Sequence, residues 1–359
     1  MPPPSTLPPP RTPDPMLAPP LRWGVLGPGW IAERFVGSLR QSTRQAVVAV
    51  ASRNLGRATA FASRWGIDRA YGGYEALVED PQVDVVYVAT PHNAHRPCAL
   101  LAIEAGRHTL VEKPLALNAT EVEELAAAAR GNGVFLMEAL WTAFLPKFDV
   151  LRQVLADGLL GEVRTVLADH GEHFGPDHRI MRADLAGGPL LDLGTYPVAL
   201  ATMVLGPAQR VLASGQPAPS GVNGQASILV THAGGAQSVL HTTLFSATPT
   251  AATIAGTEAT VTIPGPFYQP GDLRVRFGDG ATLDHREPAT GHGALHHQAA
   301  HVAAAVRDGL LESPLRPLAD TLATIRVIDE VRRQLGVVFV EEAGRRPPPG
   351  TTGGAARRS

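Results

Sequence analysis

The chain has 359 residues, of which 44% are hydrophobic, so it is long enough for two domains of ordinary size with a sizeable core. Lysine and arginine number 31 against 33 aspartates and glutamates, and the formal net charge of −2 argues against nucleic acid or an anionic membrane as the main partner. No stretch approaches the roughly 18 uncharged apolar residues that span a bilayer. Cys98, the single cysteine, excludes an internal disulfide framework, and without an export signal a cytoplasmic location is expected.

The two ends of the chain differ in composition from the part between them. Residues 1–20 hold many prolines and show almost no hydrophobic periodicity, and they carry neither the apolar stretch nor the twin arginine of an export signal. Residues 341–359 are rich in Gly, Pro and Arg. We therefore predict a disordered, proline-rich tail over residues 1–20 and a second disordered tail over residues 341–359.

The first half of the folded part alternates strand and helix signals. Residues 23–27 form an apolar run, and Ile31, Phe35 and Leu39 then recur at the four-residue spacing of a helix face. Asn54 is placed to cap a second helix. Further strands are predicted at 47–51, 83–89, 108–112 and 134–137, and further helices at 97–105 and 118–130. This alternation predicts a doubly wound parallel sheet over residues 21–141.

The pattern changes after about residue 141. A long strand is predicted at 163–174 and a helix at 188–205. Two pairs of strand-like runs flank Gly234-Gly235 and Gly278-Asp279-Gly280, a pattern typical of hairpins, and two helices follow near 293–309 and 318–335. The fold class expected is α/β: the parallel sheet is followed, over residues 142–340, by an α+β domain with a large, mostly antiparallel open sheet.

A glycine-rich turn joins the first predicted strand to the first helix. Its sequence, Gly27-x-Gly29-x-x-Ala32, permits a tight turn at the first glycine and a close approach of the backbone to a pyrophosphate at the second. The helix that starts at Trp30 and Ile31 offers free N–H groups to the phosphates. An ordinary strand-to-helix turn is the alternative, but the strand–helix–strand context favours a Rossmann-type nucleotide-binding domain.

The end of the second strand bears on the choice of cofactor. NAD sites usually place Asp or Glu about 20 residues after the glycines, to hold the ribose 2′-hydroxyl. This chain has Ser52 and Arg53 there, with no acid. Arg53 can pair with a 2′-phosphate and Ser52 can donate to it, whereas the alternative is that Arg53 is a solvated surface charge. We predict NADP as the cofactor, with NAD less favoured.

Three polar segments follow strands of the first domain, and ligands bind at such carboxyl ends. They are residues 89–93 (with Thr90, Pro91, His92 and Asn93), residues 112–114 (Glu112-Lys113-Pro114) and residues 138–141. Lys113 can protrude into a cleft beside the nicotinamide, although an ordinary loop lysine is the alternative. His92 and His95 are expected at the cofactor edge, in contact with substrate or loop, or else as solvated loop histidines.

The second domain supplies Asp192 and Tyr196. They are four residues apart, which places both on one face of the predicted helix. Asp192 is polar amid apolar neighbours, so it has either a buried packing role or a function. Tyr196 fits a core tyrosine equally well.

Four histidines crowd one segment near the end of the folded part, His292, His296, His297 and His301. Two of them, four residues apart, have a spacing that zinc sites use. No acidic or thiol partner lies beside them and the motif H-E-x-x-H is absent. We therefore predict no metal site.

In combination, these motifs are similar to those of a known enzyme family. The chain resembles, in order and spacing of motifs, the glucose–fructose oxidoreductase/inositol dehydrogenase (Gfo/Idh/MocA) family over about residues 21–340. The resemblance rests on Gly27-x-Gly29, Ala89-Thr90-Pro91-His92, Glu112-Lys113-Pro114, and Gly187-Gly188 followed by Asp192, Gly194 and Tyr196. Residues 137–142 and 311–315 resemble its dimeric dihydrodiol dehydrogenase and NADP-dependent D-xylose dehydrogenase branch.

The resemblance implies roles for three residues. Tyr196 matches the tyrosine that serves as acid/base in this branch, Lys113 the lysine of the Glu-Lys-Pro motif, and Asp192 the carboxylate that orients the substrate. A phenol pKa of about 10 is too high for a base at neutral pH, and we expect the Lys113 ammonium to lower it. Pro189 stands where glycine or a small residue is usual and Ala143 where arginine is frequent, which leaves the substrate preference open.

The resemblance implies an NADP-dependent dehydrogenase that transfers hydride between the nicotinamide and a hydroxyl of a sugar-type (aldose or pyranose) or vicinal-diol substrate. The alternatives are a trans-dihydrodiol dehydrogenase or carbonyl reductase of the same family and, from another class, a nucleotide-binding regulator without catalysis. The expected cofactor-binding residues are Gly27, Gly29, Trp30, Ile31, Ser52, Arg53, Thr90, Pro91, His92, Asn93, His95, Glu112 and Lys113.

The resemblance also implies a homodimer that pairs through the open face of the second-domain sheet. Ala226, Ile228 and Val230 show an apolar alternation that fits either packing on helices or contact with a partner subunit.

Overall fold

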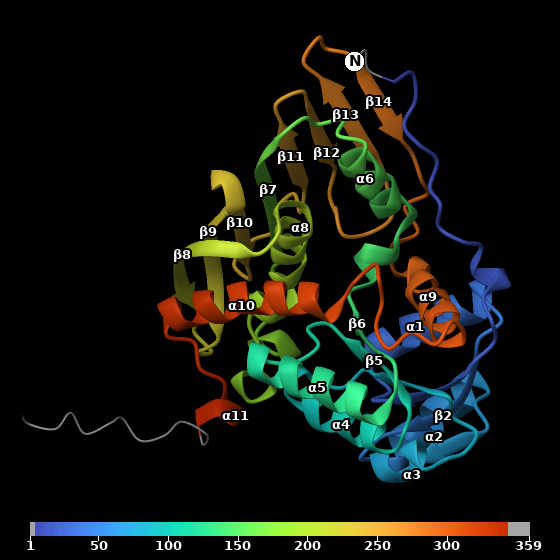
Figure 1. Cartoon of the computed structure of the whole chain (residues 1–359). Coiled ribbons are helices and arrows are strands. Elements are labelled where there is room, and N and C mark those ends of the chain that lie inside the picture. The colour runs from blue at the N-terminus through green and yellow to red at the C-terminus, as the bar shows by residue number, and fades with distance from the viewer. Residues whose placement is uncertain (1–3, 344–359) are drawn as a thin grey trace, which may run out of the picture.

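The computed structural model describes residues 4–343, which form two β-sheets with helices packed against them (Figure 1). The first sheet has six strands in the order β3-β2-β1-β4-β5-β6, and all of its pairings are parallel. Its strands are β1 (Arg22–Leu26), β2 (Ala46–Ala51), β3 (Arg69–Tyr71), β4 (Val85–Val88), β5 (His108–Glu112) and β6 (Leu136–Ala139). The helices between them are α1 (Trp30–Ser42), α2 (Leu55–Trp65), α3 (Tyr74–Val78), α4 (His95–Glu104) and α5 (Ala119–Asn132).

This strand order confirms the predicted doubly wound sheet. The order reverses between β1 and β4, which is the point where ligands bind in open α/β sheets, at the carboxyl ends of the strands. Beneath that point Phe35 of α1 contacts Trp23 of β1 and Tyr87 of β4, with ring centroids 5.5 Å and 4.0 Å away. The aromatic cluster therefore fixes the first helix on the strands whose ends form the ligand edge.

The second sheet has eight strands in the order β14-β13-β12-β11-β7-β10-β9-β8, with β7 near its centre. Only the β7–β10 pairing is parallel, which confirms the predicted mostly antiparallel sheet. Its strands are β7 (Val163–Gly171), β8 (Ala208–Pro217), β9 (Asn223–His232), β10 (Gln237–Thr243), β11 (Ala252–Gly256), β12 (Ala259–Ile263), β13 (Leu273–Phe277) and β14 (Thr282–His285).

Helices cover one face of this second sheet. Helices α6 (Pro146–Ala156) and α8 (Thr195–Leu205) lie over the face turned to the viewer in Figure 1, and α10 (Leu318–Leu335) packs against α8 and β8. Ala226, Ile228 and Val230 of β9 are buried, so the alternation seen in the sequence belongs to the helix-covered face. Within residues 4–343 no helix packs on the opposite face, where Leu167, Leu212 and Val239 are exposed.

Several elements were not predicted from the sequence. They are β3, α3, α6, β8, β11 and β12. The helix predicted over 188–205 is also wrong in part, because the structure divides it into α7 (Pro189–Asp192) and α8, and the helical segment Ala183–Asp192 meets α8 at a 44° bend. A Cβ at Gly194 would lie 2.8 Å from the Leu190 carbonyl oxygen, so the backbone turns where no side chain fits. Asp192 and Tyr196 therefore do not share the face of one continuous helix.

The predicted disordered tail over residues 1–20 is wrong for residues 4–20. This segment runs down the side of the molecule from the second sheet to the first (Figure 1). Near its start Arg11 N donates to Asp149 of α6 at 2.7 Å, and near its end the Pro19 carbonyl accepts from Gln45 Nε2 at 2.7 Å. Prolines lack the N–H groups that a helix or strand needs, but they do not prevent such contacts.

Of the tail predicted over 341–359, residues 341–343 belong to α11 (Val340–Ala343) and the rest lies outside the described residues.

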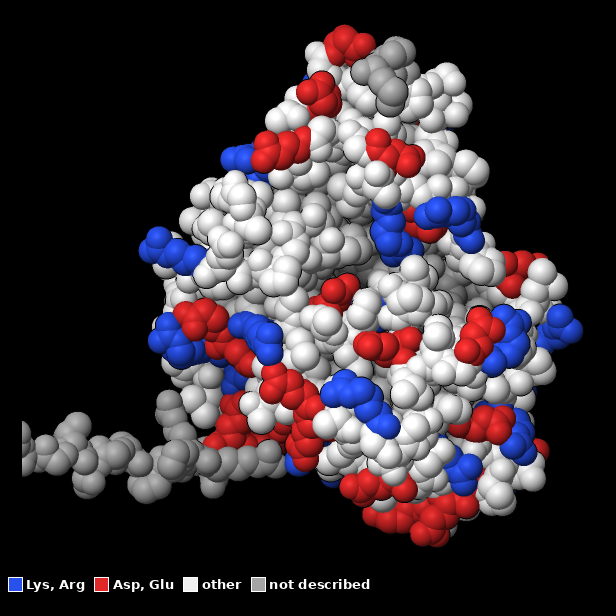
Figure 2. Space-filling view, in the orientation of Figure 1, with Lys and Arg blue, Asp and Glu red and all other residues white. Residues whose placement is uncertain are grey.

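The chain returns to the first domain after the second sheet. Helix α9 (His296–Arg307) packs against α1, and the Leu311 carbonyl accepts from Leu136 N of β6 at 3.0 Å. Acidic and basic side chains are interspersed over the lower half of the face in Figure 2, while much of its upper half is uncharged. No single described helix is long and apolar enough to cross a membrane; Ala183–Asp192 and Thr195–Leu205 meet that test only together, across their bend.

Candidate active site

The turn after β1 is shaped by two glycines. Gly27 has φ of 92°, and a Cβ there would lie 2.7 Å from the Ala89 carbonyl oxygen, so only glycine fits. Gly29 caps the N-terminus of α1, and a Cβ there would meet nothing within 4 Å. Open space at a helix N-terminus with free N–H groups is what a pyrophosphate needs. Trp30, which begins α1, is exposed beside this turn.

The end of β2 presents one exposed cation. Ser52 is buried and its Oγ accepts from Asn54 N at 3.2 Å, while Asn54 caps α2 through Arg57 N, as predicted. Arg53 between them is exposed, and no carboxylate follows the strand. Together with the glycine turn, these residues fit a dinucleotide at the carboxyl edge of the sheet.

The loop after β4 is held by protein contacts on both sides. Asn93 Nδ2 donates to the Asp184 carbonyl at 3.0 Å, and the Nδ1 of buried His92 lies 3.4 Å from the Ala186 carbonyl. The ring nitrogens of His95 lie 2.7 Å from the Pro114 carbonyl oxygen and 2.9 Å from that of Thr90. Burial lowers the pKa of His92 to about 3 and that of His95 to about 4. These side chains are therefore not solvated loop histidines; His95 ties the Thr90 loop to the Lys113-Pro114 segment.

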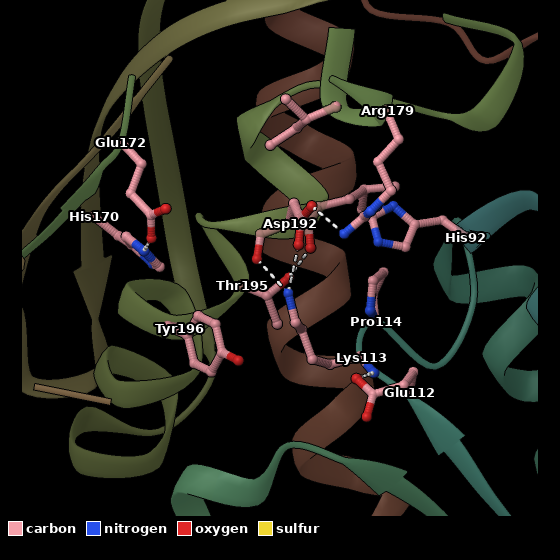
Figure 3. Close-up of polar contacts among 12 residues, drawn as sticks. His92, Glu112, Lys113, Pro114, His170, Glu172, Arg179, Asp192, Thr195 and Tyr196 are labelled. Carbon is pink, nitrogen blue, oxygen red and sulfur yellow. Dashed lines mark hydrogen bonds and ion pairs between the residues drawn. The ribbon is translucent and has the colours of Figure 1, made fainter. Parts of the chain in front are cut away.

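Lys113 and Asp192 meet between the two domains (Figure 3). Lys113 Nζ donates to Asp192 Oδ1 at 2.7 Å and to the Asp192 carbonyl at 2.6 Å, and Arg179 Nη2 donates to Asp192 Oδ2 at 2.8 Å. Burial opposes ionisation of this carboxyl, but the two cations more than offset it and hold the Asp192 pKa below its usual range. Asp192 is thus a charged carboxylate with both oxygens engaged.

Tyr196 lies beside this ion pair. Its hydroxyl accepts from Trp141 Nε1 at 3.1 Å, and Lys113 Nζ is 5.0 Å from the centre of its ring. Burial, followed by the effects of Tyr268 and Glu112, raises the Tyr196 pKa well above its ordinary value. The predicted lowering of this pKa by Lys113 is therefore wrong for this arrangement, because the ammonium is engaged by Asp192 and burial dominates.

Glu112 is a buried carboxyl group directly below Lys113. Its Oε1 accepts from the Tyr87 hydroxyl at 2.5 Å and its Oε2 from Lys113 N at 3.3 Å. Burial raises the Glu112 pKa to about 7, although the Tyr87 hydroxyl opposes the shift. The residue thus holds the backbone at Lys113 from below the cofactor edge.

Comparison with known proteins decides the family. A family model described as the oxidoreductase family, NAD-binding Rossmann fold, matches residues 21–140, and one described as the GFO/IDH/MocA C-terminal domain matches residues 148–262. The chain belongs to the Gfo/Idh/MocA family. It is an NAD(P)-dependent dehydrogenase of that family, as the resemblance implied.

Relatives of this Gfo/Idh/MocA dehydrogenase include proteins that act on diols and sugars. The trans-1,2-dihydrobenzene-1,2-diol dehydrogenase of Mus musculus is 37% identical over 334 residues, covering 90% of this chain and 99% of its own. A 3-ketoreductase from Actinomadura kijaniata, solved with NADP and TDP-benzene, has a TM-score of 0.78 at 30% identity, covering 88% of this chain and 98% of its own. Levoglucosan dehydrogenase with NADH and levoglucosan shares the fold, with a TM-score of 0.80 at 19% identity over 89% and 97% of the two chains.

Sequence reasoning missed an aromatic wall around the Gfo/Idh/MocA site. Tyr268 stacks on Tyr196 with ring centroids 4.3 Å apart, and His170 stacks on Tyr268 at 4.7 Å. On the other side His292 lies between Trp30, at 4.9 Å, and Trp141, at 5.2 Å. These rings come from segments that are distant in the sequence, so no local motif predicts that they meet.

Two of the remaining histidines of the 292–301 segment have hydrogen-bond partners, whereas the buried Nδ1 of His297 has none among the described residues. His296 Nδ1 lies 3.0 Å from Ser38 Oγ, and His301 Nε2 lies 2.8 Å from Ser313 Oγ. Within residues 4–343 no group of three or more His, Cys, Asp or Glu is arranged to hold a metal ion.

Proposed function

We propose that this chain catalyses reversible, NADP-dependent hydride transfer at a hydroxyl of a sugar-type or vicinal-diol substrate. The observation that carries the proposal is the placement of the Lys113–Asp192–Arg179 network beside the Tyr196 hydroxyl, at the carboxyl edge of the sheet that bears the Gly27 turn. The 3-ketoreductase, the levoglucosan dehydrogenase and the diol dehydrogenases among its relatives act on such alcohols or their ketones, which supports the substrate class. A cytoplasmic location stays a prediction.

Each of three residues has a distinct task in this proposal. Tyr196, a neutral phenol because its pKa is raised, donates its proton to the substrate oxygen in reduction and is left as a phenolate; in oxidation that phenolate takes the proton back from the substrate hydroxyl. Lys113 places a positive charge beside that oxygen and stabilises negative charge that develops on it. Asp192 fixes the Lys113 ammonium and, through it, orients the substrate. The nicotinamide supplies the hydride acceptor or donor.

We favour NADP over NAD because of the residues at the end of β2. Arg53 is exposed where a ribose 2′-phosphate would lie, and no acid is present to bind a 2′-hydroxyl. A guanidinium pairs with phosphate through two parallel N–H donors, which gives the preference a geometric basis. A higher affinity for NAD than for NADP would contradict this part of the proposal.

The test is nicotinamide absorbance with NADP or NAD and a panel of aldoses and a trans-dihydrodiol. We expect turnover of at least one of these substrates by the wild type, and a kcat lower by about 10²–10⁴-fold in Tyr196→Phe, which keeps the ring packing but loses the transferable proton. Near-wild-type turnover by Tyr196→Phe would refute the acid/base assignment. Tight NADP binding without turnover of any substrate would favour the alternative function, a nucleotide-binding regulator without catalysis.

We further propose a homodimer that pairs through the open face of the second sheet. Leu212, Leu229, Val239 and Leu167 are successive cross-strand neighbours on β8, β9, β10 and β7. Leu212, Val239 and Leu167 are 45%, 50% and 45% exposed, so they form an apolar row on the face that no helix covers. An uncovered apolar row of this kind is typical of a subunit interface.

A further inference from the structure

The central strand of the second sheet delivers two polar residues to the site that the proposed mechanism does not use. His170 is the second-last residue of β7 and Glu172 follows the strand directly. His170 is 1% exposed, and its ring stacks on Tyr268 and lies 5.6 Å from the ring of Tyr196. Its Nε2 is 2.8 Å from Glu172 Oε1, so the two side chains form a pair. The buried His170 ring thus lies against the acid/base tyrosine with its Nε2 paired and its Nδ1 without a hydrogen-bond partner among the described residues, and a buried polar atom left unpaired is costly.

Glu172 is fixed in position yet open to ligand. Its backbone N donates to the Thr243 carbonyl of β10 at 3.1 Å, and its Oε1 is held by His170. Its side chain remains 44% exposed. Within residues 4–343 no hydrogen bond reaches the second carboxylate oxygen, Oε2. Glu172 therefore presents one free acceptor from a held side chain.

The other carboxylates of the site have no free oxygen. Both oxygens of Asp192 are engaged, by Lys113 and Arg179, and both oxygens of Glu112 accept hydrogen bonds from Tyr87 and from Lys113 N. In Figure 3 Asp192 lies directly above the Lys113 ammonium, and Glu172 and His170 lie to one side of it, above Tyr196. A substrate with its reacting oxygen at Tyr196 would thus have Glu172 beside its neighbouring carbon atoms.

We propose that Glu172, positioned by His170, accepts a hydrogen bond from a second hydroxyl group of the substrate, next to the hydroxyl that reacts at Tyr196 and Lys113. The inference rests on the proposed function and narrows its substrate class to alcohols that carry a neighbouring hydroxyl. A hydroxyl donating to a carboxylate forms a short, strong hydrogen bond, and a substrate without that hydroxyl leaves the carboxylate partly desolvated and unpaired. Glu172 is the specificity-determining residue and His170 is a positioning residue.

The test couples a change in the enzyme to the removal of one substrate hydroxyl. Wild type, Glu172→Gln and Glu172→Leu are assayed with NADP on D-glucose against 2-deoxy-D-glucose, and on trans-cyclohexane-1,2-diol against cyclohexanol. We expect the wild type to favour the member of each pair with two neighbouring hydroxyls by on the order of 10- to 100-fold in kcat/KM. In Glu172→Leu this preference should largely disappear, mainly through KM, while the poorer substrate is little affected.

A matched control is available at the other end of β7. Glu162 precedes the strand, is exposed and pairs with Arg164, so Glu162→Gln makes the same chemical change away from the site. It should leave both substrate preferences unchanged. NADP affinity of every variant, followed by tryptophan fluorescence, verifies that the nucleotide domain is intact.

His170 is tested by the same comparison of substrates with and without the second hydroxyl. His170→Phe keeps the stack on Tyr268 but loses the hydrogen bond to Glu172, so KM for the diol should rise while KM for cyclohexanol does not. His170→Gln, which keeps a donor, should restore part of the preference. If the Glu172 variants lose kcat/KM equally on both substrates of a pair, the inference is overturned while the proposed function stands. Absence of wild-type turnover on every substrate would overturn the proposed function, and the inference with it.

Discussion

Glu112 shows how burial sets the chemistry of a single residue. The side chain is 7% exposed, and its pKa of about 7 means that it exchanges a proton near neutral pH. In the unfolded chain the same carboxyl titrates near its ordinary value of 4.5. Between those two values the folded protein holds a proton that the unfolded chain has released. Folding stability therefore falls as pH rises through this interval.

This difference can be measured directly. Going from pH 4.5 to 7, the free energy of unfolding of the wild type should fall by about 3 kcal/mol relative to that of Glu112→Gln, which cannot ionise. Denaturant unfolding at a series of pH values gives both curves. Tyr87→Phe, which removes the hydroxyl that opposes the shift, should extend the fall to higher pH. Parallel curves for wild type and Glu112→Gln would show that Glu112 has an ordinary pKa.

At the scale of residues, sequence motifs indicate which side chains meet at the carboxyl edge of the sheet, but they do not indicate the electrostatics of those side chains. The glycine turn and the Lys113, Asp192 and Tyr196 motifs could be found because each follows a predicted strand or opens a predicted helix. The direction of the Tyr196 pKa shift could not, because it depends on how deeply the ring is buried and on which group engages Lys113. Glu172 was missed because nothing in its local sequence shows that β7 ends beside Tyr196.

At the scale of elements, a buried ion pair joins β6 to the segment that leads into α10. Arg316 Nη2 donates to Glu138 Oε2 at 2.7 Å, and Thr321 Oγ1 donates to the same oxygen at 3.0 Å. Glu138 Oε1 accepts from Leu115 N at 3.2 Å, two residues after Lys113. This ion pair thus connects the C-terminal helix to the loop that carries the lysine.

Removing one member of this pair should be costly. Arg316→Met leaves Glu138 buried without its cation, and we expect a loss of about 3–5 kcal/mol in the free energy of unfolding. Arg326→Met, which breaks the exposed pair between Arg326 of α10 and Glu123 of α5, should cost less than about 1 kcal/mol. Denaturant unfolding of both variants measures the contrast. Similar small losses would mean that water or a neighbouring group replaces the buried cation.

The elements that the sequence missed share physical features. Strands β3, β11 and β12 are short, with 3, 5 and 5 residues, so each gives only a weak local pattern, and β11 also pairs with the distant strand β7. Helix α8 is apolar on almost all sides because it is buried, so no periodicity marks where it begins. The break before it is imposed by the contact between Gly194 and the Leu190 carbonyl, which only the packed structure reveals.

At the scale of the whole molecule, residues 4–20 contact both domains. The Pro9 carbonyl accepts from Gln153 of α6 at 3.0 Å, and the Met16 carbonyl accepts from Arg44 beside β2 at 2.7 Å. Leu7, which precedes both points, packs against the core. Composition alone predicted a tail here, because prolines give no periodicity even where they pack.

The proposed dimer makes a prediction at the same scale. Light scattering of the wild type at micromolar concentration should give the mass of two chains. Val239→Lys places a charge in the middle of the open-face row and should shift the protein towards the monomer, whereas Thr282→Lys, on the edge strand β14, should not. A monomeric wild type would contradict the proposal.

The central position of β7 has a practical consequence. The strand is hydrogen-bonded on both sides, to β10 and β11, so the backbone beneath residues 170 and 172 is held whatever side chains stand there. The groups that move the proton come from other segments, β5, α7 and α8. An engineer who wished to redirect this catalyst to a different alcohol would therefore randomise positions 170 and 172 first, expecting folded libraries in which the selectivity changes and the chemical step survives.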